Sequence, residues 1–225
     1  PGFIKKVKKI LEIVCHNCSK VLADRSDPDF LAAVNTRDPK ARFYRVWEVC
    51  KKKKMCESET AKSEDEETEF APGTSKAPKV SHGGCGNIQP QVRHAALELK
   101  STMDTVGEDG QKRKDSKRIK PEDAHNILRR ISDSDLGDMG LNADYARPEW
   151  MIITVLAVAP PPVRPSVSMD GTGQGMRNED DLTYKLGDII RANGNVRQAM
   201  RDGSPQHILK DFEDLLQYHV ATYMT

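Results

Sequence analysis

Five cysteines constrain this 225-residue chain more than any other feature of its sequence. Cys15 and Cys18 form a Cys-x-x-Cys pair, Cys50 and Cys56 flank a run of four lysines, and Cys85 lies in the sequence Gly-Gly-Cys-Gly. Thiolates two residues apart can bind one zinc ion from a single turn, and structural zinc usually takes four ligands in a tetrahedron. The chain is therefore expected to fold around a metal site that joins distant segments.

Helical phasing selects among the possible ligands. The apolar face of a helix expected to begin at Pro39 carries Cys50, which we interpret as a buried, unligated thiol. The full set of candidates is Cys15, His16, Cys18, Cys50, Cys56, His82 and Cys85. We favour Cys15, Cys18, Cys56 and Cys85. The alternative is a set of scattered free thiols, because the intervals of 38 and 29 residues between these segments are not those of a compact zinc ribbon.

A site of four thiolates is closed and redox-silent, so its expected role is structural. Such a site can contribute on the order of 10 kcal/mol to folding. No Gly-x-Ser-x-Gly elbow is present, and the glycine-rich stretch 171–175 lacks the helix and lysine of a phosphate-binding loop. The residues by themselves predict no catalytic centre.

Charge is distributed unevenly along the first part of the chain. Residues 1–56 carry fourteen Lys and Arg against six Asp and Glu, whereas residues 57–69 carry seven acids and one lysine. This pattern fits a basic module next to nucleic acid, or a solvated surface followed by a disordered acidic loop. No apolar run approaches the ~20 residues of a membrane span. No signal peptide is visible either, which indicates a reducing, intracellular compartment.

The hydrophobic pattern predicts an α+β fold. Helical spacing indicates a short amphipathic helix that delivers Cys15, a second helix over 29–35, and a third from Pro39. Residues 57–81 are expected to be a disordered loop, and 87–103 to form two short strands with a turn near His94. Residues 104–120 are predicted to be an exposed loop, followed by helices that begin near Pro121 and Ser132.

The C-terminal third contains a β-branched run and two further helices. Residues 150–158 are predicted to be a buried strand that Pro160–Pro162 ends. In residues 179–225, apolar residues follow the alternating spacing of four and three that a coiled coil requires. The expected contact positions are Leu182, Leu186, Ile189, Asn193, Val196 and Met200, then Ile208, Phe212, Leu215, His219 and Thr222. This spacing predicts a helical hairpin, although one corner of an ordinary helical bundle would show the same pattern.

The ordered motifs resemble one family, the largest subunit of eukaryotic RNA polymerase II in its N-terminal clamp region. The resemblance covers almost the whole chain, and its most specific runs are Arg-Pro-Glu-Trp-Met at 147–151 and Pro-Pro-Pro-Val-Arg-Pro at 160–165. Further matches are Cys15–Cys18, Arg42–Cys50, Gly83–Asn87 with Gln89-Pro90, Glu179–Leu186 and Leu215–Thr222. The two specific runs are similar to RNA polymerase II rather than to polymerases I or III.

The resemblance implies a nuclear, zinc-binding fragment of a nucleotidyltransferase. It implies zinc at Cys15, Cys18, Cys56 and Cys85, with Cys50 unligated. It divides the chain into a clamp head at 1–103, a clamp body at 104–178 and a clamp coiled coil at 179–225. The catalytic Mg²⁺ and its aspartates would lie beyond this fragment, whose own residues include no catalytic group. Implied partners are other polymerase subunits, template DNA, the RNA–DNA hybrid, and initiation and elongation factors at the hairpin.

Two other functions fit the same residues. A free-standing zinc-dependent adaptor would bind protein partners through the hairpin, without a polymerase around it. Catalytic aspartates encoded downstream of Thr225 would exclude this adaptor. An independent DNA-binding module would instead show steeply salt-dependent duplex binding.

Overall fold

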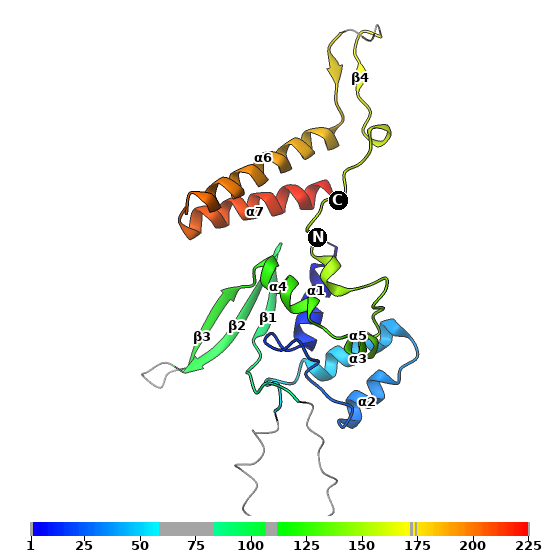
Figure 1. Cartoon of the computed structure of the whole chain (residues 1–225), viewed down its shortest axis with the longest axis vertical. Helices are drawn as coiled ribbons and strands as arrows, with labels where there is room; N and C mark the ends of the chain where they lie inside the picture. Colours follow the sequence, from blue (N-terminus) through cyan, green and yellow to red (C-terminus); the bar gives the residue numbers. More distant parts are fainter. Residues whose placement is uncertain (1, 59–82, 107–111, 172, 174, 225) are drawn as a thin grey trace, which may run out of the picture. The chain divides into compact units, whose positions relative to one another are not determined.

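The computed structural model describes residues 2–58, 83–106, 112–171, 173 and 175–224 (Figure 1). Helices and small antiparallel sheets are mixed along this part of the chain, which confirms the α+β class. Two compact units are present, Gly2–Ile153 and Thr154–Thr225, and each is described by itself. The boundary expected at 103/104 lies inside strand β2 (Glu98–Val106), whereas the two units divide between Ile153 and Thr154.

Three helices open the first unit, as predicted: α1 (Ile4–Ile13), α2 (Pro28–Val34) and α3 (Pro39–Cys50). A carboxylate caps each of the last two, since Asp27 accepts a hydrogen bond from the Asp29 N–H at 3.1 Å and Asp38 accepts one from the Ala41 N–H at 2.9 Å. Each cap precedes a proline, whose fixed φ suits the first helical position. The α1 side chains that face inward are Val7, Ile10, Leu11 and Ile13.

The hydrophobic core of this unit lies between α1, α2, α3, α4 (Pro121–Arg129) and α5 (Asp133–Asp138), with β1 (Gln91–Ala95) beside α1. The largest fully buried side chains include Phe30, Phe43, Ile10, Leu128, Leu136 and Met139. The Trp47 indole N–H donates to Glu12 at 2.7 Å and so joins α3 to α1. Packing of α1 fixes the place where the chain leaves the helix toward Cys15.

One antiparallel sheet, of order β1-β2-β3, lies against this core (Figure 1). Its third strand is β3 (Lys112–Arg118). A two-residue turn at Ala96–Leu97 joins β1 to β2, and Ala96 takes the left-handed conformation at φ 50°. The two strands predicted within 87–103 are therefore confirmed.

The predicted exposed loop at 104–120 is wrong over most of its length. Residues 104–106 belong to β2, and they pair with the first residues of β3. Backbone hydrogen bonds make this pairing, while every residue of β3 is polar, so the sequence lacks the apolar alternation that marks a half-buried strand. Opposite charges support the register, since Asp104 lies across from Lys114. From residue 59 on, the predicted acidic loop at 57–81 lies outside the described residues.

The two helices predicted after the sheet are confirmed as α4 and α5. The Ser132 hydroxyl accepts a hydrogen bond from the Asp135 N–H at 3.2 Å and caps α5. After α5 the chain turns at Gly140, whose φ is +72°. A Cβ added there would lie 2.7 Å from the carbonyl oxygen of Pro39, the first residue of α3. The absence of a side chain at Gly140 therefore lets the end of α5 meet the start of α3.

Replacing Gly140 by alanine is expected to lower the free energy of unfolding by about 2 kcal/mol, because a left-handed backbone and a backbone clash are combined. Gly137→Ala is the matched control, since it lies within α5 and a Cβ there meets nothing within 4 Å. This control is expected to raise stability by up to ~1 kcal/mol through helix propensity. Urea denaturation of both variants measures the difference, and equal changes would contradict the close approach.

The predicted buried strand at 150–158 is also wrong. This segment begins in a 3₁₀ helix, η2 (Pro148–Met151), and continues without regular structure. Trp150 is 58% exposed and Val155 is 86% exposed. In the described part of the chain no strand pairs with this run, and prolines at 148 and 160 restrict it at both ends. A β-branched composition favours a strand only where a neighbouring strand is available.

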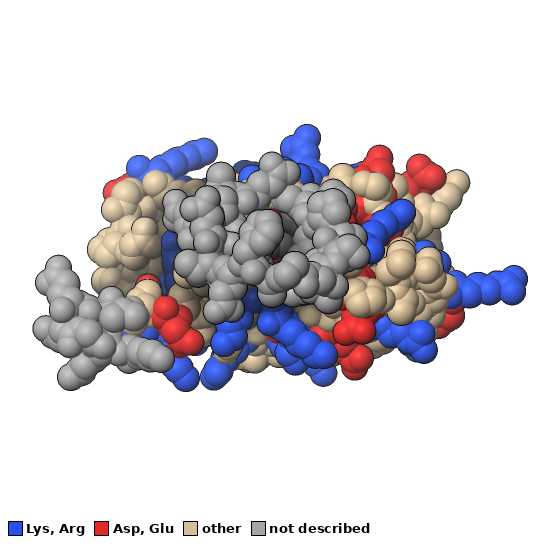
Figure 2. All heavy atoms as spheres, turned by 90° about the horizontal axis from the view of Figure 1, so that it is seen from below, with Lys and Arg blue, Asp and Glu red and all other residues tan. Residues whose placement is uncertain are grey.

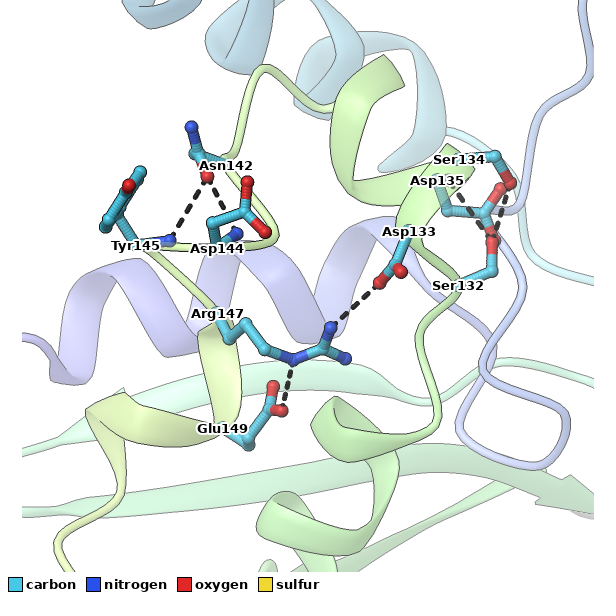
Figure 3. A network of polar contacts seen from close by, with 9 residues as sticks. All are labelled: Ser132, Asp133, Ser134, Asp135, Asn142, Asp144, Tyr145, Arg147 and Glu149. Atoms are coloured by element: carbon cyan, nitrogen blue, oxygen red, sulfur yellow. Dashed lines mark hydrogen bonds and ion pairs between the residues drawn. The ribbon is translucent and has the colours of Figure 1, made fainter.

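A polar network anchors the residues that precede this run (Figure 3). The Arg147 guanidinium donates to Glu149 at 2.5 Å and to Asp133, the first residue of α5, at 2.8 Å. Nearby, the Asn142 side-chain oxygen accepts hydrogen bonds from the backbone N–H groups of Asp144 and Tyr145. Glu149 is only 8% exposed. Arg147 thus neutralises a buried carboxylate and ties η2 to α5.

The second unit contains a short two-stranded sheet and two long helices. Strands β4 (Val167–Ser168) and β5 (Arg177–Asn178) pair after a 3₁₀ turn, η3 (Pro161–Val163), and the helices are α6 (Asp181–Arg201) and α7 (Gln206–Tyr223). The Tyr223 hydroxyl accepts a hydrogen bond from the Ala159 N–H at 3.0 Å, and Arg164 donates to the Ala159 carbonyl at 2.7 Å. These bonds hold the proline-rich run against the end of α7.

Helices α6 and α7 form an antiparallel hairpin, since Lys185 near the start of α6 lies 3.4 Å from His219 near the end of α7 (Figure 1). Some predicted contact positions are wrong, because Met200 is 65% exposed and Leu215 is 43% exposed. The neighbouring residues Ala199 and Leu216 are less exposed than Met200 and Leu215. Two buried alanines seven residues apart, at 192 and 199, leave little bulk between the helices. No described helix is both long and apolar enough to cross a membrane.

Candidate metal centre

The first pair of thiols lies on a tight loop after α1. Val14 bridges Val21, the Cys15 N–H donates to the Lys20 carbonyl at 2.8 Å, and the Ser19 N–H donates to the Cys15 carbonyl at 2.9 Å. Ser19 takes φ 62°, which closes the loop. Both Cys15 and Cys18 therefore belong to one short turn, as their spacing predicts.

The second pair is brought together by two short extended segments. Met55 bridges Ile88, the Cys56 N–H donates to the Asn87 carbonyl at 2.9 Å, and the Gly86 N–H donates back to the Cys56 carbonyl at 2.8 Å. Gly86 has φ +74°, a conformation that glycine adopts without strain. Cys56 and Cys85 therefore meet, although 29 residues separate them.

The four predicted sulfur atoms, of Cys15, Cys18, Cys56 and Cys85, lie within 4.8 Å of one another. The Cys15 and Cys85 sulfurs are 3.5 Å apart, and those of Cys18 and Cys56 are 3.7 Å apart. In a tetrahedron with zinc–sulfur bonds of about 2.3 Å, neighbouring sulfurs lie roughly 3.8 Å apart. None of these four cysteines forms a disulfide bond. The cluster thus has the donor set and the spacing that a tetrahedral metal ion requires.

Polar hydrogens surround these sulfurs. The backbone N–H of Asn17 points to Cys15 Sγ and that of Cys85 points to Cys56 Sγ, each at 3.4 Å. Side-chain amides add to them, since Gln89 Nε2 lies 3.2 Å from Cys15 Sγ and Asn87 Nδ2 lies 3.3 Å from Cys85 Sγ. Such donors stabilise negative charge on sulfur. The sequence pattern did not predict a role for these two amides, although they stand only two and four residues after Cys85.

Burial and hydrogen bonding act against each other at these thiols. Burial raises the pKa of Cys15 and of Cys56, so both hold their protons without a compensating charge. At Cys85 burial acts to raise the pKa, but hydrogen bonds, led by one from the Asn87 backbone, outweigh it and lower the pKa to about 6. A divalent cation would supply the charge that the two buried thiolates need.

The other candidate ligands do not join this cluster. Cys50 is fully buried on the inner face of α3, and burial raises its pKa to about 12. The His16 ring donates from Nε2 to the Leu11 carbonyl at 2.9 Å, and burial lowers its pKa. His82 lies outside the described residues. The prediction that Cys50 is a buried hydrophobe is confirmed.

The fold and this cluster define an α+β module whose separate segments one metal ion could join. Within the described ranges no other group of His, Cys, Asp or Glu side chains comes together in this way. Over residues 1–225 the chain matches the family described as RNA polymerase Rpb1, domain 1. It belongs to this family, and is therefore an N-terminal part of the largest subunit of a DNA-directed RNA polymerase. At this level the resemblance found in the sequence is confirmed.

Proposed function

We propose that this chain is the clamp region of the largest subunit of a eukaryotic RNA polymerase II, working in the nucleus. In this proposal Cys15, Cys18, Cys56 and Cys85 hold one structural zinc ion. The enzyme makes RNA on a DNA template, and this region contributes no catalytic group. The observation that carries the proposal is the convergence of four sulfurs from three separate segments, within a chain that belongs to the Rpb1 family.

The proposed zinc ion holds separate segments of the chain together. It joins the turn after α1 to the segments at Lys54–Cys56 and at Cys85–Gln89, which meet through few backbone hydrogen bonds. Four thiolate ligands leave no coordination position for substrate, so the ion polarises nothing and activates no water. Its contribution is to fix the surface formed by α1, α3 and the first sheet.

The specific motifs support the assignment to polymerase II. Arg147 and Glu149, in the Arg-Pro-Glu-Trp-Met run, form the buried ion pair of Figure 3. Arg164, in the Pro-Pro-Pro-Val-Arg-Pro run, donates to the Ala159 carbonyl and to the Thr183 hydroxyl. Both arginines hold irregular segments in place, which gives a physical reason for these sequences.

The α6–α7 hairpin is the proposed coiled coil that docks initiation and elongation factors. It carries large apolar side chains that are mostly exposed: Tyr184, Ile190, Met200 and Tyr218 at 60%, 72%, 65% and 53%. Exposed apolar side chains on a long hairpin suit a protein partner. This proposal assigns the hairpin to proteins and leaves nucleic acid to other surfaces.

Two measurements test the proposed function. Elemental analysis of the reduced, folded chain is expected to give about one zinc per chain. A value near zero would refute the proposed structural zinc site. An affinity-tagged largest subunit that carries this chain is expected to copurify with the remaining polymerase subunits from nuclei. Recovery of the chain without them would favour the free-standing adaptor.

A further inference from the structure

The four sulfur atoms of the cysteine cluster differ in their access to solvent. Cys15 and Cys56 are fully buried, whereas Cys18 and Cys85 are partly exposed. Cys85 is the more exposed of these two. Oxidation of a cysteine follows the exposure and the thiolate character of its sulfur. A small oxidant dissolved in water therefore reaches the Cys85 sulfur before the other three.

The surroundings of Cys85 carry positive charge. Lys20 donates from Nζ to the Gly83 carbonyl at 3.0 Å, so a cation stands beside the Gly83–Gly86 loop that contains Cys85. The described segments that flank residues 59–82 lie at the lower end of the first unit in Figure 1. Figure 2 views the molecule from below and shows many Lys and Arg side chains on that face. Reactive cysteines occur in partly exposed, electropositive surroundings of this kind.

A second sulfur lies close to that of Cys85. The Cys15 and Cys85 sulfurs are 3.5 Å apart, and a disulfide bond is about 2.05 Å long. Cys15 is held in its turn, since its N–H donates to the Lys20 carbonyl. Gly84 and Gly86 stand on either side of Cys85, and glycine adopts a wide range of backbone conformations. The Cys85 side of the pair can therefore move to close the gap.

We propose that Cys85 is a site of reversible oxidation by a peroxide, and that Cys15 completes the reaction by forming a disulfide bond with it. The inference rests on the proposed zinc site, because a bound divalent cation holds both sulfurs as thiolates, the form that a peroxide attacks. Disulfide bonds inside cells are usually transient and redox-sensing. The cluster thus responds to oxidants in addition to joining segments of the chain.

The reaction with hydrogen peroxide takes place in two steps whose atoms and electrons balance. The Cys85 thiolate attacks one peroxide oxygen, so a sulfur–oxygen bond forms, the oxygen–oxygen bond breaks and hydroxide leaves. The Cys15 thiolate then attacks the Cys85 sulfur, so the disulfide bond forms, the sulfur–oxygen bond breaks and a second hydroxide leaves. The two thiolates together lose two electrons, which the peroxide gains, and zinc undergoes no redox change.

Oxidation is expected to release the metal and to keep the separated segments linked. Cys18 and Cys56 remain as thiols, and two ligands do not complete a structural zinc site. The disulfide bond still connects the turn after α1 to the Gly83–Gly86 loop. A dithiol reductant cleaves this bond by thiol–disulfide exchange. The chain can then bind zinc again without finding its fold anew.

The test treats the assembled, zinc-loaded polymerase with hydrogen peroxide, with and without dimedone, a reagent that traps sulfenic acids. Peptide mass spectrometry is expected to find the first trapped sulfenic acid at Cys85. Without dimedone it is expected to find a Cys15–Cys85 disulfide, which a dithiol reductant removes. Cys50 is fully buried and lies outside the cluster, so it is expected to stay reduced.

Two matched variants keep four ligands and change one sulfur each. Cys85→His and Cys18→His both give three cysteines and one histidine, a set that also binds structural zinc. Zinc release by peroxide, followed with a chromogenic chelator, is expected to slow by about tenfold in Cys85→His, because the exposed thiolate is absent. Cys18→His is the control, and it is expected to keep the wild-type rate and to form the same disulfide. If either variant fails to bind zinc, the disulfide mapping in the unaltered polymerase decides.

Three results would overturn the inference and leave the zinc site in place. The first is an initial disulfide that joins Cys18 to Cys15 or to Cys56. The second is equal rates of zinc release in the two histidine variants, and the third is a cluster that peroxide does not oxidise. Zinc content is measured before peroxide is added, because a polymerase without zinc at this cluster would refute the proposed zinc site itself.

Discussion

Cys56→Ser is expected to abolish zinc binding and to unfold the segments that the metal joins. Cys56 is fully buried, and its sulfur lies 3.7 Å from that of Cys18 and 3.4 Å from the Cys85 N–H. A structural zinc site contributes on the order of 10 kcal/mol, comparable with the whole stability of a domain. Zinc per chain is expected to fall to near zero. Amide hydrogen exchange is expected to show lost protection at Cys15–Lys20 and at Gly86–Gln89.

Cys50→Ala provides the control for this prediction. Cys50 is also fully buried, but its sulfur lies outside the cluster of four. Its removal leaves a small cavity, with an expected loss of about 1 kcal/mol and unchanged zinc content. Full zinc occupancy in Cys56→Ser would contradict the ligand assignment. Loss of zinc from a folded Cys50→Ala chain would contradict it equally.

Arg147→Ala is expected to lower the free energy of unfolding of the first unit by roughly 3 kcal/mol. The change leaves the Glu149 carboxylate, 10% exposed as a side chain, without its guanidinium partner. A buried charge that loses its partner costs more than the original pair contributed. Urea denaturation of the zinc-loaded chain measures this loss.

Two further variants test the cause of the loss. Asp133→Asn removes the other acceptor of Arg147, but this side chain is 73% exposed, so a change below about 1 kcal/mol is expected. Combining Arg147→Ala with Glu149→Gln removes the unpaired charge and is expected to recover part of the loss. If the double variant is less stable than Arg147→Ala alone, burial of the Glu149 charge is not the cause.

Much of the first unit could be predicted because its local signals are strong. Asp27-Pro28 and Asp38-Pro39 start helices in the structure as they do in the sequence pattern, since a carboxylate cap and a proline act within one turn. The burial of Cys50 follows from its phase with Phe43 and Val46 on α3. These features depend only on residues a few positions apart.

The predictions that failed concern segments whose structure depends on neighbouring strands or helices, which the local hydrophobic pattern does not reveal. The β2–β3 ribbon forms although every residue of β3 is polar, because the backbone groups of two strands can pair without apolar side chains. The run at 150–158 is apolar and β-branched, yet a strand needs a neighbouring edge and none of the described strands supplies one. In the hairpin, Met200 and Leu215 are exposed while the neighbouring Ala199 and Leu216 are more enclosed, because the facing helix selects which residues lie on the inner side.

The cysteine cluster shows most clearly which properties the sequence determines and which the tertiary structure determines. The sequence by itself determined which residues are chemically able to bind metal, and helical phase was enough to set Cys50 apart. Only the tertiary structure decided that Cys15 and Cys85, 70 residues apart, place their sulfurs within 3.5 Å. It also decided that Gln89 and Asn87 direct their amides at those sulfurs. Donor chemistry is a property of single residues, whereas convergence depends on the path of the whole chain around its core.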